Sequence, residues 1–174
     1  MQQKLSNIIF HDNAQGEHEM ESKGQIAHFN VARLRHAPGD PRVAGFIDNV
    51  GKINAIAERS PGYVWRWADE SKAVGGVIIY QAADADPRFA ISLSVWNSVA
   101  DLWHFVNKTA HGSFLRRRGE WFEPWPGPNY VVWSHSDLEP PSVEEGWLRL
   151  RRLASEGPNA EAFDFAFAGL NAAH

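Results

Sequence analysis

The order in which hydrophobic periodicity changes along the chain limits its fold more than any other feature. Alternation of apolar and polar residues, typical of half-buried strands, is found at 26–34, 63–68, 88–96 and 129–135, with a further short candidate at 77–80. Apolar residues at helical spacing occur at 41–60, after Ser98, and from Ser142 to near Gly157. This order predicts an α+β fold, a ferredoxin-like split βαβ arrangement with helices on one face of an antiparallel sheet.

Cap and breaker residues mark where the helices begin. Asp40 is a good N-cap, and Pro41 fits the first helical position. Ser98–Asp101 and Ser142–Glu145 resemble capping boxes. Within the helix that follows Ser98, we expect Gly112 to bend the helix or to split it in two.

The length of 174 residues suits one domain with flanking segments. We expect an N-terminal extension at 1–25, a ferredoxin-like domain at 26–157, and a C-terminal tail at 158–174 that packs on the domain. The extension has one short apolar patch, Ile8–Phe10, which is too short for the core of a signal peptide.

The aromatic content predicts how the second face of the sheet is covered. The chain has 8 Trp and 10 Phe but only 3 Tyr. Trp65, Trp67, Trp96 and Trp133 fall on predicted strands, and only the last helix and the tails remain to cover the face opposite the first helices. We therefore expect a second copy to pack there, giving a homodimer with an aromatic-lined interior, a dimeric α/β barrel.

Composition also excludes several classes of protein. The formal net charge of -4 argues against nucleic-acid binding, which needs clustered positive charge. The absence of Cys excludes disulfides, zinc ribbons, iron–sulfur clusters and thiol catalysis. No apolar run is long enough to span a bilayer, so we expect a cytoplasmic protein without a membrane partner. Phosphate-binding glycine motifs, GxSxG and HExxH are also missing.

Polar side chains on buried strands are the first candidates for a site. Asn30, Ser92 and Ser94 lie opposite clear apolar stripes, and His28 and Arg66 share their face. In a sheet-to-sheet dimer this face is buried, and buried polar groups need partners from protein, water or ligand. The alternative is ordinary polarity at the dimer interface.

Aromatic residues and one histidine complete the predicted pocket. Trp65, Trp96 and Trp133 would line it, although core packing explains most of the eight tryptophans. His135, on the last predicted strand, suits proton transfer, with a structural histidine as the alternative. Arg116–Arg118 would fit an oxyanion, but such a run is more often a solvated helix face.

A resemblance to a known family covers roughly residues 26–165. It is carried by the segments AHFNVARL, GFIDNVGKINAIAERSPGYVWRW, DPRFAISLSVWNSVADLWHFVNKTAHGSFLRRRGEWF and LRLRRLASEGPNAEAFDF. These segments resemble a bacterial family described as a domain of unknown function (DUF3291-like). That family is similar to the dimeric α/β-barrel superfamily, which includes antibiotic-biosynthesis monooxygenases, heme-degrading monooxygenases and lactone isomerases.

The resemblance implies a dimer of ferredoxin-like protomers, with a pocket either between sheet and helices or inside the barrel. It also points to His111, in the segment KTAHGSFLRRR, because a helical histidine is the axial ligand in heme-binding relatives. His104 and His111 are too far apart to share one metal ion, so no metal site is predicted. The chain departs from the family after the fourth strand, where the Gly of a Gly-His-Pro-like turn is missing and the His is displaced to His135.

Three functions follow as hypotheses. The first is a small-molecule tailoring enzyme of natural product biosynthesis, which oxygenates, cyclises or isomerises a hydrophobic or aromatic metabolite without a cofactor. Its predicted catalytic residues are Asn30, Arg66, Ser94 and His135, and its predicted substrate contacts are His28, Trp65, Ser92, Trp96 and Trp133. The second is a binder of heme or another hydrophobic ligand, with His111 as axial ligand. The third is a dimeric module without catalytic activity.

Overall fold

The computed structural model describes residues 24–68, 73–74, 77–78 and 86–170. Its main sheet has four strands, β1 (Gln25–Arg33), β2 (Tyr63–Arg66), β5 (Phe89–Trp96) and β6 (Tyr130–His135). The spatial order is β2-β5-β1-β6, and all neighbours are antiparallel. Each parallel pair, β1 with β2 and β5 with β6, is therefore split by a strand between them. This topology confirms the predicted α+β, ferredoxin-like arrangement. A short hairpin, β3 (Ala73–Val74) and β4 (Val77–Ile78), precedes β5.

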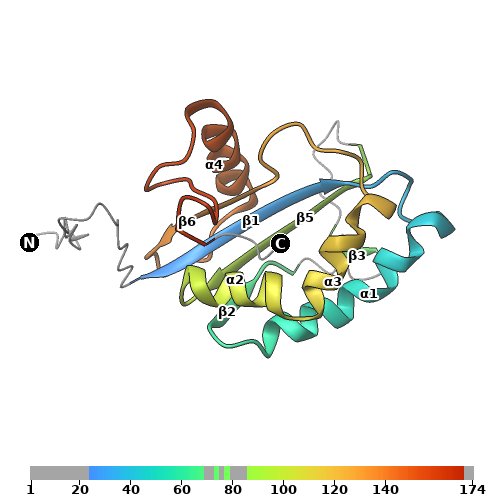
Figure 1. Ribbon diagram of the computed structural model, residues 1–174, viewed down its shortest axis with the longest axis horizontal. Coiled ribbons are helices and arrows are strands. Elements are labelled where there is room, and N and C mark those ends of the chain that lie inside the picture. Colours follow the sequence, from blue (N-terminus) through green and yellow to red (C-terminus); the bar gives the residue numbers. More distant parts are fainter. Residues whose placement is uncertain (1–23, 69–72, 75–76, 79–85, 171–174) are drawn as a thin grey trace, which may run out of the picture.

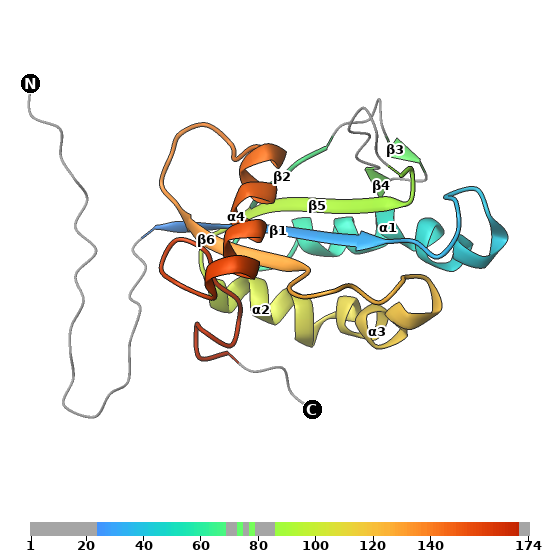
Figure 2. The same cartoon turned by 90° about the horizontal axis from the view of Figure 1, so that it is seen from above.

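The helices divide between the two faces of the sheet (Figures 1 and 2). One face carries α1 (Pro41–Glu58), α2 (Val99–Lys108) and α3 (Ala110–Arg117), and a 3₁₀ turn, η2 (Arg118–Glu120), follows α3. The other face carries α4 (Val143–Glu156), so the prediction that the helices lie on one face of the sheet was wrong for this helix. The predicted caps are in place, because the side chains of Asp40, Ser98 and Ser142 accept backbone N–H groups in the first turns of α1, α2 and α4.

The helix that follows Ser98 is split at Thr109, so the prediction that Gly112 would divide it was wrong. Thr109 has an extended backbone, and its hydroxyl accepts a hydrogen bond from the N–H of His111. The same hydroxyl donates to the carbonyl of Phe105 at 2.7 Å. Thr109 therefore ends α2 and begins α3, whereas Gly112 lies inside α3, where a Cβ would come 3.0 Å from the carbonyl of Asn107.

The apolar stripe of the sheet lies under α4. It consists of Ala27, Phe29, Val31, Ile91, Leu93, Val95, Val131 and Trp133, all buried within the chain. α4 contributes Val143, Leu150 and Leu153 to this core. The prediction that a second copy must cover this face was therefore wrong, because α4 and the aromatic residues around it cover it. The homodimer itself stays a prediction.

The segment after α4 adds a short extension to the free edge of β6. Val132 and Phe163 exchange two backbone hydrogen bonds of 2.8 and 2.9 Å, and Phe163 is fully buried on the face of α1 to α3. Phe165 packs against Tyr130 at 5.2 Å between ring centroids. No helix in the described part of the chain is both long and apolar enough to cross a membrane.

Candidate functional site

A row of polar residues divides the core between the sheet and helices α1 to α3. One apolar cluster is centred on Ile26, Trp96, Leu102, Phe105 and Phe163, and the other on Leu34, Val43, Ile47, Ala90 and Trp121. Between them, β1 carries His28 and Asn30, and β5 carries Ser94 and Ser92 directly opposite. Paired residues of adjacent strands point to the same face. We call His28, Asn30, Ser92 and Ser94 the polar band.

His28 is an imidazole without a hydrogen-bond partner in the described part of the chain. Its ring lies 6.0 Å from that of Tyr130. Burial and, to a smaller extent, the nearby His111 together lower the pKa of His28 to about 3. The ring is therefore neutral at physiological pH and has hydrogen-bonding capacity that the protein does not use.

His111 faces the band from the first turn of α3. Its Nδ1 lies 3.2 Å from the carbonyl oxygen of Val106, a carbonyl at the end of α2. A carbonyl accepts only, so Nδ1 carries the proton and Nε2 has the free lone pair. Burial lowers the pKa of His111, while the bond to Val106 opposes that shift. Its ring packs 4.9 Å from Phe105, which stacks on Trp96 at 5.2 Å.

The other members of the band are partly engaged and partly open. Asn30 donates to the carbonyl of Asn129 at 3.1 Å, and the hydroxyl of Ser94 accepts from the indole N–H of Trp96 at 3.0 Å. Ser92 makes no hydrogen bond through its side chain to a described residue, and it is exposed although its neighbours on β5 are buried. Solvent or a ligand therefore reaches the band at Ser92.

Arg66 also belongs to this face, because it pairs with Ser94 across β2 and β5. Its guanidinium donates to the carboxylate of Glu58 on α1 at 2.7 Å. The pair is partly exposed at the edge of the sheet, so Arg66 borders the band with its charge already compensated.

The contact of Tyr130 with His28 is missing from the predicted set, and Asn54 of α1 is a further candidate. Asn54 of α1 shares the helical stripe of Val50 and Ala57, which pack on the sheet in the two separate clusters. A polar residue inside an apolar stripe was the signal for it. Tyr130 falls on the predicted strand 129–135, and no sequence pattern indicates its contact with His28.

Three predicted site residues lie on the opposite face of the sheet. Trp133 is fully buried under α4, and Trp65 packs against the same cluster. His135, two residues after Trp133, shares its face. The predicted set is therefore divided: His28, Asn30, Arg66, Ser92, Ser94, Trp96 and His111 lie on the side of α1 to α3, and Trp65, Trp133 and His135 do not. The predicted aromatic lining of Trp65, Trp96 and Trp133 is thus divided between the two faces of the sheet.

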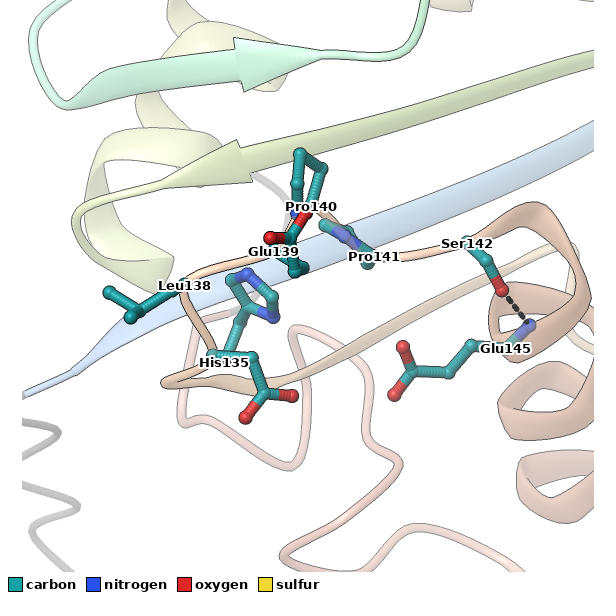
Figure 3. Close-up of a pocket in the computed structure, with 8 residues that line it drawn as sticks. His135, Leu138, Glu139, Pro140, Pro141, Ser142 and Glu145 are labelled. Carbon is teal, nitrogen blue, oxygen red and sulfur yellow. Dashed lines mark hydrogen bonds between the residues drawn. The ribbon is translucent and has the colours of Figure 1, made fainter.

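His135 lines a separate, open pocket of about 550 Å³ between the end of β6 and the start of α4 (Figure 3). The side chain is 7% exposed. Asp137, Glu139 and Glu145 supply carboxylates to the lining, together with Leu138, Pro140, Pro141 and Ser142. This pocket and the polar band are on opposite faces of the sheet.

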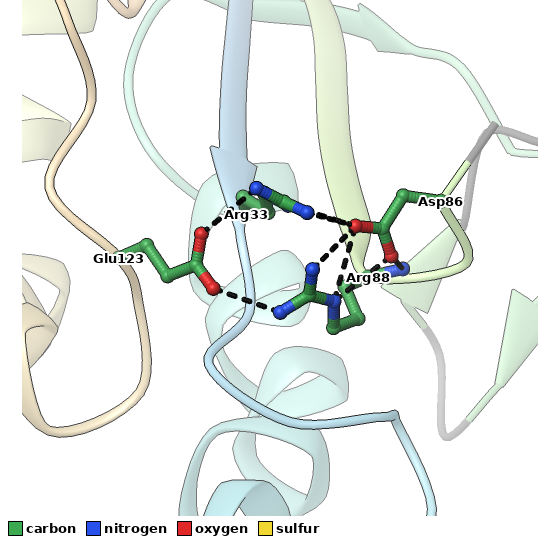
Figure 4. Close-up of polar contacts among 4 residues, drawn as sticks. All are labelled: Arg33, Asp86, Arg88 and Glu123. Carbon is green, nitrogen blue, oxygen red and sulfur yellow. Dashed lines mark hydrogen bonds and ion pairs between the residues drawn. The ribbon is translucent and has the colours of Figure 1, made fainter.

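Four charged residues form a ring of ion pairs at the end of the sheet where β1 ends and β5 begins (Figure 4). Arg33 and Arg88 each pair with both Asp86 and Glu123, with the Arg88–Glu123 contact at 2.8 Å. Hydrogen bonds from Arg88, then from Arg33, hold the pKa of the Asp86 carboxyl well below its usual range. The ring joins the end of β1, the segment before β5 and the loop after η2. Its two positive and two negative charges cancel, so it leaves no net charge for a ligand.

No group of three or more His, Asp or Glu residues in the described ranges could hold a metal ion. The site is therefore built from neutral imidazoles, hydroxyls and amides enclosed by aromatic rings.

The fold and its split βαβ topology define a ferredoxin-like α+β protein. The chain belongs to the family described as "Domain of unknown function (DUF3291)", whose model matches residues 25–172. No curated protein matches the chain significantly.

Solved structures with a similar fold were found at low identity. A protein of unknown function from Nitrosomonas europaea has a TM-score of 0.46 and 12% identity, over 69% of this chain and 97% of that one. SnoaB, a cofactor-independent oxygenase from Streptomyces nogalater, has a TM-score of 0.41 and 14% identity, over 68% and 99%. A conserved protein from Methanosarcina mazei has a TM-score of 0.45 and 11% identity, over 66% and 95%. The fold assignment rests on the strand order and not on these likenesses.

Proposed function

We propose that this chain is a small-molecule enzyme that binds a hydrophobic or aromatic substrate at the polar band. The observation that carries the proposal is the neutral, unbonded imidazole of His28 beside His111, inside a core that is otherwise apolar on both sides. His28 is half-buried, and its ring nitrogens are not among the fully enclosed atoms without a partner, so a molecule at the band can reach them. A bound molecule that supplies the missing partners explains why these groups are there.

The chemistry of the band favours an uncharged substrate. Its members are neutral, and Arg66, the bordering cation, is already paired with Glu58. Phe105, Trp96 and Tyr130 enclose the two imidazoles, which suits an apolar or aromatic body. A hydroxyl or carbonyl on that body would meet His28, Asn30 or Ser94.

The two histidines suit different tasks. With a pKa of about 3, His28 is too weak a base to hold a proton at neutral pH, so it orients the substrate through a hydrogen bond. His111 directs its free Nε2 lone pair away from Val106 and receives support from that carbonyl, so it is the better proton acceptor. Proton removal from a phenol or enol would start an oxygenation, cyclisation or isomerisation.

Binding of 2-naphthol, an aromatic body with one hydroxyl, tests the proposal. We expect quenching of tryptophan fluorescence and a shift of the His28 and His111 ring resonances in the wild-type protein. His28→Gln and His111→Gln should each weaken binding roughly tenfold, the worth of one hydrogen bond. His104→Gln is the matched control, because His104 is exposed on α2. Binding that is unchanged in all three variants would contradict the site.

Catalysis needs a separate measurement. Hydroxylated aromatic compounds are incubated with the protein in air, and products are identified by mass spectrometry. We expect turnover that is lost in His111→Gln under conditions where the ligand still saturates the variant. Binding without turnover for every compound would favour the module without catalytic activity.

One observation favours the heme alternative. The hydrogen bond from Nδ1 of His111 to a backbone carbonyl fixes the tautomer in which Nε2 is free, the arrangement found in ligating histidines. Heme binding through Nε2 is therefore the second candidate function.

A further inference from the structure

The pocket at His135 is a second polar site, remote from the polar band. It is formed where the chain leaves β6 and turns into α4, on the face opposite α1 to α3 (Figure 3). Nothing in the proposed function uses it.

His135 points to a missing ligand. The residue is more than nine-tenths buried, and its ring makes no hydrogen bond to a described residue. It is a lining residue of the pocket, and Figure 3 shows the imidazole beneath the loop from Leu138 to Pro141, with Glu145 approaching from α4. Its ring nitrogens are not among the fully enclosed atoms without a partner, so they are reachable from the pocket and available to a bound group.

The charge of the lining selects the class of ligand. Asp137, Glu139 and Glu145 line the pocket, and no Lys or Arg is among its lining residues. Glu145 is paired with Arg149 at 3.0 Å, so its charge is already compensated. Asp137 and Glu139 have no ion pair with any described residue. Two carboxylates are therefore left for a cation.

The remaining lining residues select the shape of the ligand. Leu138, Pro140 and Pro141 present apolar surface beside the carboxylates. A volume of about 550 Å³ exceeds what one ion needs and lies in the range of small-molecule sites. Because the described residues hold no metal-binding group of three, a bare metal ion does not fit.

We propose that this pocket binds an organic cation, a primary ammonium or guanidinium group on an apolar stem. The charged head pairs with Asp137 and Glu139 and donates an N–H to the imidazole of His135, while the stem packs on Leu138 and the two prolines. Such a group is found on a free aliphatic amine and on the Lys or Arg side chain of a protein partner.

The test is an NMR titration of the full chain with butylammonium, followed through the ring resonances of His135 at physiological ionic strength. 1-Butanol has the same stem without the charge and is the ligand control. We expect saturable binding of butylammonium and none of butanol. Asp137→Asn combined with Glu139→Gln should weaken butylammonium roughly tenfold, the sum of two exposed charge pairs. Glu144→Gln removes an exposed charge of α4 outside the lining and should leave binding unchanged.

Three outcomes would overturn the proposal: equal binding of butanol, unchanged binding in the double variant, or an equal loss in Glu144→Gln, which would indicate only a diffuse negative field. His135→Gln supplies an independent check, because an amide can accept the same N–H and should retain most of the affinity. An acetylated Leu-Arg-Leu amide distinguishes the sources. Tighter binding of this peptide than of butylammonium assigns the cation to a protein partner, and the reverse assigns it to a free amine.

Discussion

The close contact between α4 and the sheet predicts that Gly146→Ala destabilises the protein relative to a Gly→Ala substitution in an open part of another helix. A Cβ on Gly146 of α4 would lie 2.6 Å from two ring carbons of Phe29. Phe29 is fully buried and already packs edge-on against Trp147, with ring centroids 5.3 Å apart. Because the ring has no free side to move toward, the backbone of α4 must shift. Overpacking of this kind costs about 1–3 kcal/mol.

Gly51 of α1 is the matched control, because a Cβ there meets no atom within 4 Å. Both substitutions gain the same helix propensity, about 1 kcal/mol for Gly to Ala. That gain cancels in the comparison, so Gly146→Ala should be about 1–3 kcal/mol less stable than Gly51→Ala. The free energy of unfolding of both variants is measured by urea denaturation monitored by circular dichroism.

A double-mutant cycle identifies Phe29 as the cause. In a Phe29→Leu background the side chain is smaller, so the penalty of Gly146→Ala should shrink, giving a coupling between the two sites. If Gly146→Ala proves as stable as Gly51→Ala, then α4 does not pack on β1 as described, and the face it covers is open to another partner.

Four further predictions concern the titration of His28, two glycines in turns, heme binding and the oligomeric state. The pKa of His28 is lowered from 6.5 to about 3. The unfolded chain therefore binds a proton at this residue at higher pH than the folded chain does, and stability should fall as pH drops below about 6.5. In His28→Gln, the free energy of unfolding measured by urea titration should depend less steeply on pH, at pH values above those at which carboxylates titrate. Gly62 has φ 77° and a Cβ there would clash with the side chain of Asp101, whereas Gly127, with φ 91°, has free space; Gly62→Ala should therefore lower the thermal midpoint much more than Gly127→Ala. If the heme alternative is correct, hemin gives a Soret band that His111→Ala abolishes, and a spectrum that does not differ between the two proteins would reject it. Light scattering on a sizing column should give twice the mass of one chain, and a monomer would contradict the dimer.

Periodicity predicted the positions of strands and helices because it depends on short-range patterns. The alternation over 88–96 and the stripe over 41–60 each became an element with nearly the predicted bounds. The helix break was misplaced because a Thr109 side chain that bonds to both helices decided it, and glycine content did not.

Periodicity could not predict which layer covers each face. Alternation shows that His28 and Asn30 share a side and that Phe29 and Val31 share the other, but not what lies above either side. That was decided by α4, which packs its Val143, Leu150 and Leu153 on the apolar stripe. With that stripe filled, the polar side had to be the one under α1 to α3. Trp133 and His135 are separated from the band because they lie on the face of the sheet that α4 covers.

The polar band interrupts what could be one continuous apolar core between the sheet and helices α1 to α3. Ile26 with Trp96 and Ala32 with Ala90 are cross-strand pairs at its two ends, and apolar residues at the two positions between would join both clusters into one core. At about 25 cal/mol for each Å² of apolar surface buried, such a core would be more stable. The chain instead places two polar pairs there, the imidazole of His28 opposite the hydroxyl of Ser94 and the amide of Asn30 opposite the hydroxyl of Ser92, and leaves Ser92 reachable from solvent. Stability lost at a site that a ligand can reach is the usual mark of function in a fold. The band, rather than the more numerous tryptophans, is therefore where activity should be sought.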